Sequence, residues 1–292
     1  MQGFDDIWTG GAPVADWNAA YDNSGSVRGA EAFVPRWQGE AAAFRERLAP
    51  EGRAKLRTPY GAAPRRHYDL FLPEDAPRGL FVFVHGGYWK SQEINTWSHF
   101  AGGMLARGFA AALPEYTLCP DIGIAGIVAE IGACLDALAL AVPEGDIVLA
   151  GHSAGGHLVS RMLCRNAPIL PGTAARIARV LSISGVHDLR PLLATAMNDT
   201  LGLDAISAAA ESPALLLPRP GVSITCLVGG AELPEFRRQN ALLANAWAGL
   251  GARTVALEAP GRHHFDVVDE LLDPASPLVS HLADGSSQEG MS

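Results

Sequence analysis

Positive charge is scarce in this chain. Its 292 residues include 22 Lys and Arg against 31 Asp and Glu, which gives a formal net charge of −9. Because a protein that binds nucleic acid needs a basic face to neutralise phosphates, we expect no nucleic-acid partner. No Lys or Arg precedes Arg28, so the amino terminus also lacks the positive start of a secretory signal.

Cysteine and long apolar runs are also limited. The four cysteines have no paired spacing: Cys119, Cys134, Cys164 and Cys226. This usage suits buried apolar roles in a reducing cytoplasm better than a disulfide framework or a zinc site. The longest apolar helix candidate, residues 122–142, carries Glu130 and Asp136, so we predict no membrane span. We therefore expect a cytoplasmic protein without a membrane partner.

The remaining composition, 48% hydrophobic and 18% charged, is that of an ordinary globular protein. The sequence has no internal repeat and no long linker, so we predict a single domain over residues 1–292. Within it, residues 1–50 are expected to form an N-terminal helical segment. Residues 186–220, rich in Leu, Ala and Pro, are a candidate cap, and residues 284–292 are expected to be a disordered tail.

Strand-like and helix-like segments alternate along the chain. Two short strands, 55–59 and 67–72, flank a turn and predict a hairpin-like opening. A helix is expected over 40–48, with Pro35 marking a boundary. Further strands are expected at 80–84, 109–113, 146–150, 179–184, 223–228 and 254–257, and helices at 96–107, 122–142, 154–164, 235–250 and 267–272. Apolar strands separated by helices predict an α/β fold with a mostly parallel sheet covered on both faces.

A candidate nucleophile follows the strand at 146–150. The stretch Gly151-His152-Ser153-Ala154-Gly155 fits G-x-S-x-G between a strand and a helix. Such a tight turn projects the serine hydroxyl, and the helix N-terminus behind it favours developing negative charge. The alternative is a glycine-rich turn that only packs closely or cradles a phosphate, but the dinucleotide and P-loop patterns are both missing from it.

A serine hydroxyl needs a base, and in this architecture the order along the chain is Ser, acid, His. The last strand is followed by His263 and His264, and we favour His264 because Phe265 can anchor its loop in the core. The turn after the strand at 223–228 offers Glu232 as the acid. Glu235 is interpreted as a favourable partner of the next helix dipole, and Asp188 and Asp266 stay open as competing acids.

The sequence His85-Gly86-Gly87-Tyr88-Trp89 directly follows the strand at 80–84. Glycines there allow bare N–H groups to face a carbonyl oxygen, as an oxyanion hole requires. We assign Gly87 and Tyr88 as donors with Gly86 at the bend, and Ala154 supplies the amide after the nucleophile. Tyr88 and Trp89 are expected to wall the substrate pocket. A hairpin turn with surface aromatics is the alternative.

These motifs together resemble the α/β-hydrolase family of kynurenine formamidases (arylformamidases) and their bacterial esterase relatives. The resemblance rests on HGGYW and GHSAGG, and extends to Tyr21-Asp22-Asn23 and to the stretches at 114–118, 184–192 and 234–239. It implies hydrolysis of an aryl N-formyl amide or a small aryl ester, with no metal or organic cofactor.

Residue by residue, the triad of that family is carried over as Ser153, Glu232 and His264. The family commonly has Asp as the acid, and Glu here is a departure. The predicted substrate pocket comprises Trp89, Tyr21, Asn23, Tyr116 and His152, although His152 and His157 lie too close to the serine to present a ring to its hydroxyl.

Two other functions stay open at this stage. One is a general short-chain carboxylesterase without a formamidase role, because esters and formamides pass through the same tetrahedral intermediate. The other is a non-catalytic binding protein that keeps the fold. In each case the expected partner is a small molecule, and a homodimer is a candidate assembly.

Overall fold

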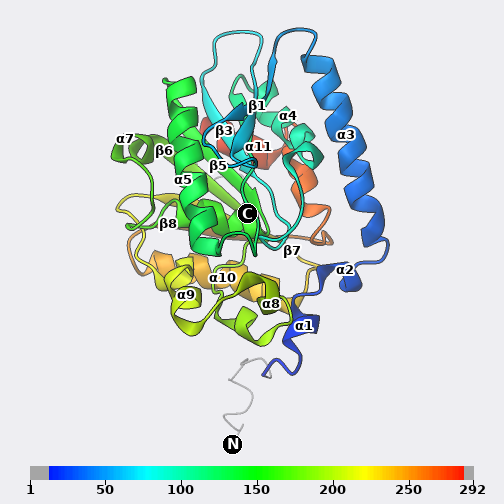
Figure 1. The fold of residues 1–292 in the computed structure, drawn as a ribbon, viewed down its shortest axis with the longest axis vertical. Coiled ribbons are helices and arrows are strands. Elements are labelled where there is room, and N and C mark those ends of the chain that lie inside the picture. The colour runs from blue at the N-terminus through cyan, green and yellow to red at the C-terminus, as the bar shows by residue number, and fades with distance from the viewer. Residues whose placement is uncertain (1–12, 286–292) are drawn as a thin grey trace, which may run out of the picture.

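A computed structural model describes residues 13–285 and shows a twisted sheet between two layers of helices (Figure 1). The sheet has eight strands in the order β1-β2-β4-β3-β5-β6-β7-β8. Their bounds are Ala54–Pro59 (β1), His67–Phe71 (β2), Gly79–Val84 (β3), Ala110–Pro114 (β4), Asp146–His152 (β5), Ile177–Ile183 (β6), Ser223–Gly229 (β7) and Arg253–Ala259 (β8).

The sheet is mostly parallel. β1 pairs with β2, and β2 with β4, in antiparallel register, and every other neighbouring pair is parallel. Each predicted strand is present within a few residues of its expected bounds. The predicted hairpin opening is confirmed, and so is the α/β-hydrolase class of fold.

Side chains of the central strands alternate between two hydrophobic cores. On β3, Leu80, Val82 and Val84 belong to one core, whereas Phe81 and Phe83 belong to the other. All five are fully buried, which explains why β3 reads as an unbroken apolar run.

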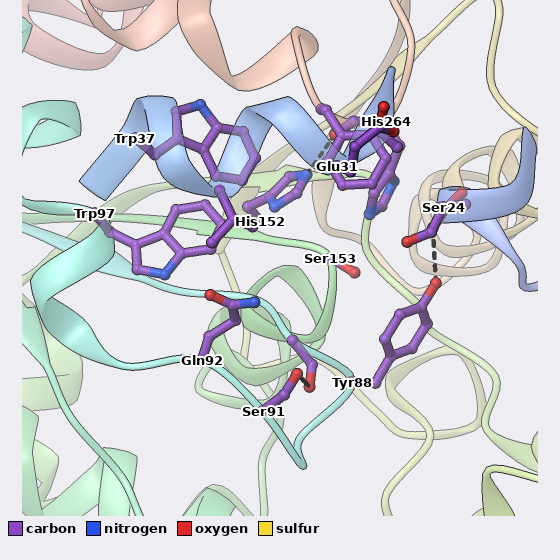
Figure 2. A pocket seen from close by; sticks show the side chains of 15 residues that line it. Ser24, Glu31, Trp37, Tyr88, Ser91, Gln92, Trp97, His152, Ser153 and His264 are labelled. Atoms are coloured by element: carbon purple, nitrogen blue, oxygen red, sulfur yellow. Dashed lines mark hydrogen bonds between the residues drawn. The ribbon is translucent and has the colours of Figure 1, made fainter. Parts of the chain in front are cut away.

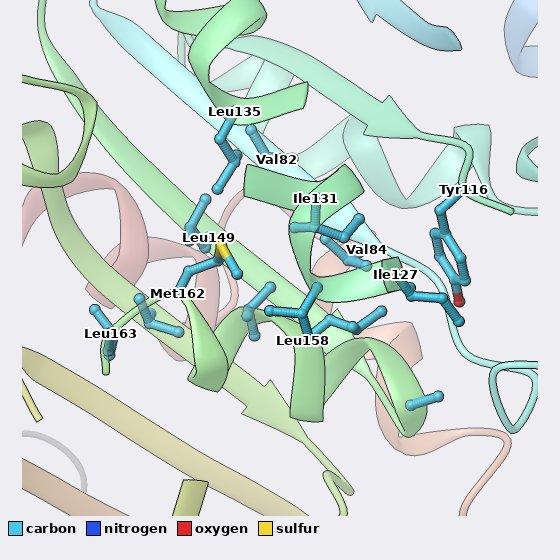
Figure 3. Packing of buried hydrophobic residues seen from close by; sticks show 14 of the residues in the cluster. Val82, Val84, Tyr116, Ile127, Ile131, Leu135, Leu149, Leu158, Met162 and Leu163 are labelled. Atoms are coloured by element: carbon cyan, nitrogen blue, oxygen red, sulfur yellow. The ribbon is translucent and has the colours of Figure 1, made fainter. Parts of the chain in front are cut away.

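Helices cover both faces. The first core is closed by α5 (Ile124–Ala141), α6 (Ala154–Arg161) and α10 (Pro234–Ala248), as Figure 3 shows for α5 and α6. The second is closed by α3 (Phe33–Leu48), α4 (Gly102–Ala106) and α11 (Pro277–Asp284). A short helix, α7 (Pro171–Arg176), precedes β6.

Among the described residues, α5 is the one helix long and apolar enough to cross a membrane by length and composition. In this structure Ile127, Ile131 and Leu135 are buried against the sheet side of the helix (Figure 3). Glu130 accepts hydrogen bonds from the backbone and side chain of Thr117. These contacts are those of a core helix in an α/β domain.

Two expectations about helices were wrong. Residues 96–107 form no continuous helix but two 3-10 turns, η3 (Ile94–Thr96) and η4 (Ser98–Ala101), followed by α4, because Trp97 and Phe100 pack against Trp37 and this tertiary packing overrides local helix propensity. Residues 267–272 form a 3-10 turn, η7 (Val267–Leu271). Pro35 marks a helix boundary as predicted, because it lies in the first turn of α3, where its missing N–H costs nothing, although the helix begins at Phe33 rather than at residue 40.

The N-terminal segment and residues 186–220 carry short helices. The first has α1 (Trp17–Ala20), α2 (Asn23–Ser26) and η2 (Ala30–Ala32), and the second has η5 (Arg190–Ala194), α8 (Asn198–Leu201), α9 (Ala205–Ala210) and η6 (Pro213–Leu215). The division into one domain with an N-terminal helical segment and a cap stays a prediction. Most of the predicted tail lies outside the described residues, although Asp284 is the last residue of α11.

The four cysteines are buried and free, as their spacing predicted. Burial raises the pKa of the Cys226 thiol to about 12 and that of Cys164 to about 11. They therefore behave as small apolar side chains rather than as nucleophiles.

Candidate active site

Ser153 sits on a sharp turn between β5 and α6. Its backbone angles, φ 56° and ψ −117°, are unusual for a residue with a side chain. The turn is possible because its neighbours are glycines. A Cβ on Gly155 would collide with the carbonyl oxygen of Val84, and one on Gly156 would lie 2.6 Å from Ser182 Oγ. The elbow predicted from G-x-S-x-G is therefore present in the backbone.

His264 and Glu232 lie together on the loops that follow β8 and β7. The Nδ1–H of His264 donates to Glu232 Oε2 at 2.8 Å. The other carboxylate oxygen, Oε1, accepts from Ser184 Oγ at 2.6 Å and from the N–H of Gly229 at 2.7 Å. Both side chains are buried, and three donors fix the carboxylate. The imidazole is thereby held in the tautomer that leaves Nε2 free to accept a proton.

The competing carboxylates have other partners. Asp188 forms a two-pronged pair with Arg190, with distances of 2.9 and 2.8 Å. These hydrogen bonds lower the pKa of Asp188 despite its partial burial, which alone would raise it. Asp266 accepts from the N–H of His263 at 2.6 Å. Neither carboxylate is hydrogen-bonded to the ring of His264 within the described chain.

Glu235 is more than a helix-dipole partner. It is buried in the first turn of α10, and its carboxylate binds Arg238 at 2.7 Å. The same carboxylate accepts from Tyr21 OH at 2.7 Å and from Gln239 Nε2 at 2.9 Å. It therefore ties the N-terminal segment to α10.

Ser153 and His264 line one cavity of about 450 Å³, and Figure 2 shows the serine hydroxyl facing its interior. The other lining residues come from the N-terminal segment, α3, the loop after β3, the end of β5 and the loop after β8: Asn23, Ser24, Ala30, Glu31, Val34, Trp37, Gly87, Tyr88, Ser91, Gln92, Trp97, His152 and Phe265. Such a volume fits a small aromatic molecule.

No direct hydrogen bond joins the Ser153 hydroxyl to the His264 ring within residues 13–285. The two groups share the cavity, and catalytic hydrogen bonds often tighten only in the complex with substrate.

The loop after β3 has an unusual backbone conformation that, in the described part of the chain, leaves N–H groups unpaired beside Ser153. Gly87, Tyr88 and Trp89 all have positive φ, at 113°, 52° and 57°. Within the described residues, the N–H groups of Gly87, Tyr88 and Ala154 donate no hydrogen bond to the protein. A Cβ on Gly86 would lie 3.0 Å from the Cβ of Ser153, so this glycine permits the close approach of loop and elbow.

Tyr88 connects this loop to the N-terminal segment. Its hydroxyl donates to the carbonyl oxygen of Tyr21 at 2.6 Å and accepts from Asn23 Nδ2 at 3.1 Å. Burial raises the pKa of Tyr88 to about 12, so the phenol keeps its proton at neutral pH. The oxyanion loop and the pocket wall are therefore held by one side chain.

Three predicted pocket residues do not line the cavity. Trp89 is fully buried and donates through Nε1 to His157 Nδ1 at 3.2 Å, because the positive φ values turn its side chain into the first core. Tyr116 is buried with its hydroxyl on the carbonyl oxygen of His85 at 3.0 Å. The Tyr21 side chain points to Glu235, and only its backbone carbonyl affects the cavity, by accepting a hydrogen bond from the lining residue Tyr88. Asn23 and His152 do line the cavity.

His152 supports the histidine loop rather than the serine. Its Nε2–H donates to the backbone carbonyl of His264 at 2.8 Å, and the two rings pack with centroids 4.7 Å apart. Burial, with the nearby His264 ring, lowers the pKa of His152 well below its usual value. His152 is therefore neutral.

Sequence reasoning missed most of the apolar wall. Trp37 and Trp97 come from distant parts of the chain and pack with ring centroids 4.8 Å apart beside His152 (Figure 2). Phe265 packs on Phe33 at 5.4 Å and tilts against Trp37 at 6.2 Å. The motif Tyr21-Asp22-Asn23 gave a signal for the N-terminal wall, whereas no local pattern marked the two tryptophans.

Gln92 was also missed, and it is held by a buried ion pair. Arg65 binds Glu115 and donates to the carbonyl oxygen of Gln92 at 2.8 Å. Glu115 also accepts from the N–H of Ile94 at 2.7 Å. Burial would raise the pKa of Glu115, but His85, Ile94 and Arg65 together lower it. This pair fixes the loop that closes one side of the cavity.

The chain is similar to several known proteins. The family model BD-FAE matches residues 68–206. Kynurenine formamidase of Danio rerio is 26% identical over 238 residues, covering 78% of this chain and 80% of that protein. The crystal structure of a candidate thioesterase from Silicibacter sp. TM1040 is 45% identical, with a TM-score of 0.86, over 91% of this chain and 98% of that one.

Esterase B of Lactobacillus rhamnosis shares the fold, with a TM-score of 0.60 at 18% identity over 85% of this chain and 90% of its own. The fold, the elbow motif and these relatives agree with one another. The chain belongs to the kynurenine formamidase-like family of α/β-hydrolases and their esterase relatives, and it is a hydrolase that acts on an amide or an ester bond.

Proposed function

We propose that this chain is a serine hydrolase that cleaves a small aryl N-formyl amide, similar to N-formylkynurenine, or an aryl or short-chain ester. Ser153 is the nucleophile, His264 the general base and Glu232 the carboxylate that orients the imidazole. One observation carries the proposal. The Ser153 hydroxyl and the His264 ring line the same cavity, with Glu232 2.8 Å behind the ring.

In this mechanism, Ser153 Oγ forms a bond to the substrate carbonyl carbon while its proton passes to Nε2 of His264. The oxyanion accepts hydrogen bonds from the N–H groups of Gly87, Tyr88 and Ala154, and each such donor typically contributes about 3 kcal/mol. The C–N or C–O bond then breaks, and His264 gives its proton to the leaving amine or alcohol. Water repeats the sequence on the acyl-enzyme and releases formate or another small acid.

The side chains that line the cavity support the proposal of an aryl substrate. Trp37, Trp97 and Phe265 give it an aromatic wall beside Ser153, and a flat ring packs well against such side chains. The second candidate is a general carboxylesterase without a formamidase role. Thioesters belong in the comparison because the relative at 45% identity is a candidate thioesterase. Values of kcat/KM on N-formylkynurenine, a formanilide, and matched aryl esters and thioesters distinguish these functions.

We further propose that the enzyme acts in the cytoplasm on a small molecule, without a metal or organic cofactor. The triad and the free amide groups supply the base, the nucleophile and the anion stabilisation that acyl transfer needs. The homodimer stays a prediction.

Replacement of the nucleophile tests the proposal. Ser153→Ala should lower kcat on an aryl acetate by about 10⁴-fold or more and abolish labelling by a fluorophosphonate, while circular dichroism stays unchanged. Ser24→Ala is the matched control, because Ser24 lines the same cavity away from the elbow and should keep both properties. Near-parental turnover by Ser153→Ala would overturn the proposal.

A further inference from the structure

The charged lining of the cavity is acidic only. Among its lining residues in the described chain, Glu31 is the one Asp, Glu, Lys or Arg side chain. Glu31 is exposed in the first turn of η2 and forms no ion pair within residues 13–285. Figure 2 shows it on the same side of the cavity as His264. A ligand that reaches this wall therefore meets a carboxylate.

The cations of the surrounding elements are engaged elsewhere or exposed. Arg36 on α3 binds Asp269 at 3.1 Å, and Arg65 below Gln92 binds Glu115. Arg262 on the histidine loop pairs with both Asp266 and Glu270 at 3.6 Å. Arg28 and Lys90 are exposed and do not line the cavity. A substrate carboxylate would find no guanidinium or ammonium partner in it.

A second observation on the same wall concerns Asn23. The Tyr88 hydroxyl donates its one proton to the carbonyl oxygen of Tyr21. It can therefore only accept from Asn23 Nδ2, and this hydrogen bond fixes the orientation of the Asn23 amide. Asn23 Oδ1 is then a buried acceptor without a donor among the described residues. This oxygen is shielded from the cavity, but as an unpaired acceptor it offers no favourable partner to an anion on this wall.

The described lining of the cavity therefore holds one charged carboxylate and no Lys or Arg. We propose that the cavity selects aryl substrates that carry an ammonium or another hydrogen-bond donor and discriminates against those whose only charged group is a carboxylate, with Glu31 as the specificity-determining residue. This inference rests on the proposed function, whose site it uses. It separates this enzyme's preferred substrates from acidic aryl amides and esters.

Three phenyl acetates of matched leaving-group reactivity test it: one with a meta-aminomethyl group, one with a meta-carboxymethyl group and one with a neutral meta-ethyl group. We expect kcat/KM for the ammonium substrate to exceed that for the carboxylate substrate by about tenfold at neutral pH and low salt, because attraction and repulsion of about threefold each multiply. High salt should reduce this ratio, since Glu31 is exposed.

Glu31→Gln should lower the ratio about tenfold, to near one, mainly through KM. Glu46→Gln is the control, because Glu46 is an exposed residue of α3 that does not line the cavity. An unchanged ratio in Glu31→Gln, or equal rates on the three esters, overturns this inference while the hydrolase proposal stands. Failure of the parent enzyme to cleave the neutral ester instead overturns the proposed function.

Discussion

His152, the residue before the elbow serine, holds the backbone of the histidine loop. Its Nε2–H lies 2.8 Å from the carbonyl oxygen of His264, which the chain reaches only after three further strands. Two segments distant in sequence are thus joined directly beside the reacting groups. The position of His264 therefore depends on β5 as well as on its own loop.

His152→Phe keeps an aromatic ring but leaves the carbonyl of His264 buried without a donor. We expect the free energy of unfolding to fall by about 1–3 kcal/mol and kcat/KM on an aryl ester to fall about tenfold as the imidazole loses its position. Urea denaturation and steady-state kinetics measure both. His152→Gln, which retains an N–H donor, should recover part of the activity, and equal losses in the two variants would argue against this role.

The two acid candidates predict opposite results. Glu232→Gln should lower kcat by about 10²- to 10⁴-fold, because the amide can no longer stabilise the imidazolium that forms in the transition state. Asp188→Asn should leave kcat within about twofold, since Asp188 binds Arg190 rather than the ring of His264. Initial rates on one aryl ester decide between them. Loss of activity in Asp188→Asn alone would reassign the acid.

Buried histidines predict a loss of stability in acid. Burial lowers the pKa of His157 and His187 to about 3 and that of His99 to about 4. Below pH 6.5 the unfolded chain binds protons at these sites and the folded chain does not, so the stabilisation is complete above pH 6.5 and declines as pH falls toward the folded values. Each site costs about 1.4 kcal/mol per pH unit in that window.

Urea midpoints measured between pH 7 and pH 5 test this effect. The midpoint should fall steadily, and replacing His99 by Gln should make the decline shallower by about one proton. A midpoint that is constant over this window would show that these rings are not neutral and buried in the folded protein.

Close packing at the elbow predicts a severe effect of one methyl group. Gly155→Ala places a Cβ against the carbonyl oxygen of Val84, so we expect destabilisation of about 3 kcal/mol or more, or failure to fold. Gly172→Ala in α7 is the control, because no heavy atom lies within 4 Å of its added Cβ. That variant should gain about 0.5–1 kcal/mol. Similar melting temperatures for the two variants would contradict the packing argument.

The sequence was informative where chemistry depends on local pattern. Apolar runs located the strands, and the glycines around Ser153 predicted the elbow because only a residue without Cβ fits there. The order Ser153, Glu232, His264 followed from the position of each loop after a parallel strand. The structure then showed the 2.8 Å hydrogen bond between His264 and Glu232.

Predictions from the sequence failed where the direction of a side chain depends on tertiary packing. An aromatic residue after a glycine pair can face the substrate or the core, and the backbone φ of Trp89, at 57°, decides for the core. Trp37 and Trp97 meet only once α3 packs across the sheet, so neither shows a local signal. The 3-10 turns before α4 likewise reflect the packing of Trp97 and Phe100 against Trp37 rather than a local signal.

The contribution of α2, η2 and α3 to the cavity has a consequence for how such enzymes diversify. These helices precede the first strand of the sheet and lie outside residues 68–206, which match the family model. Preference for a leaving group can therefore change by exchange of the first fifty or so residues while the chemical machinery is inherited intact. A chimaera carrying this stretch from a relative would be expected to adopt the donor's substrate range.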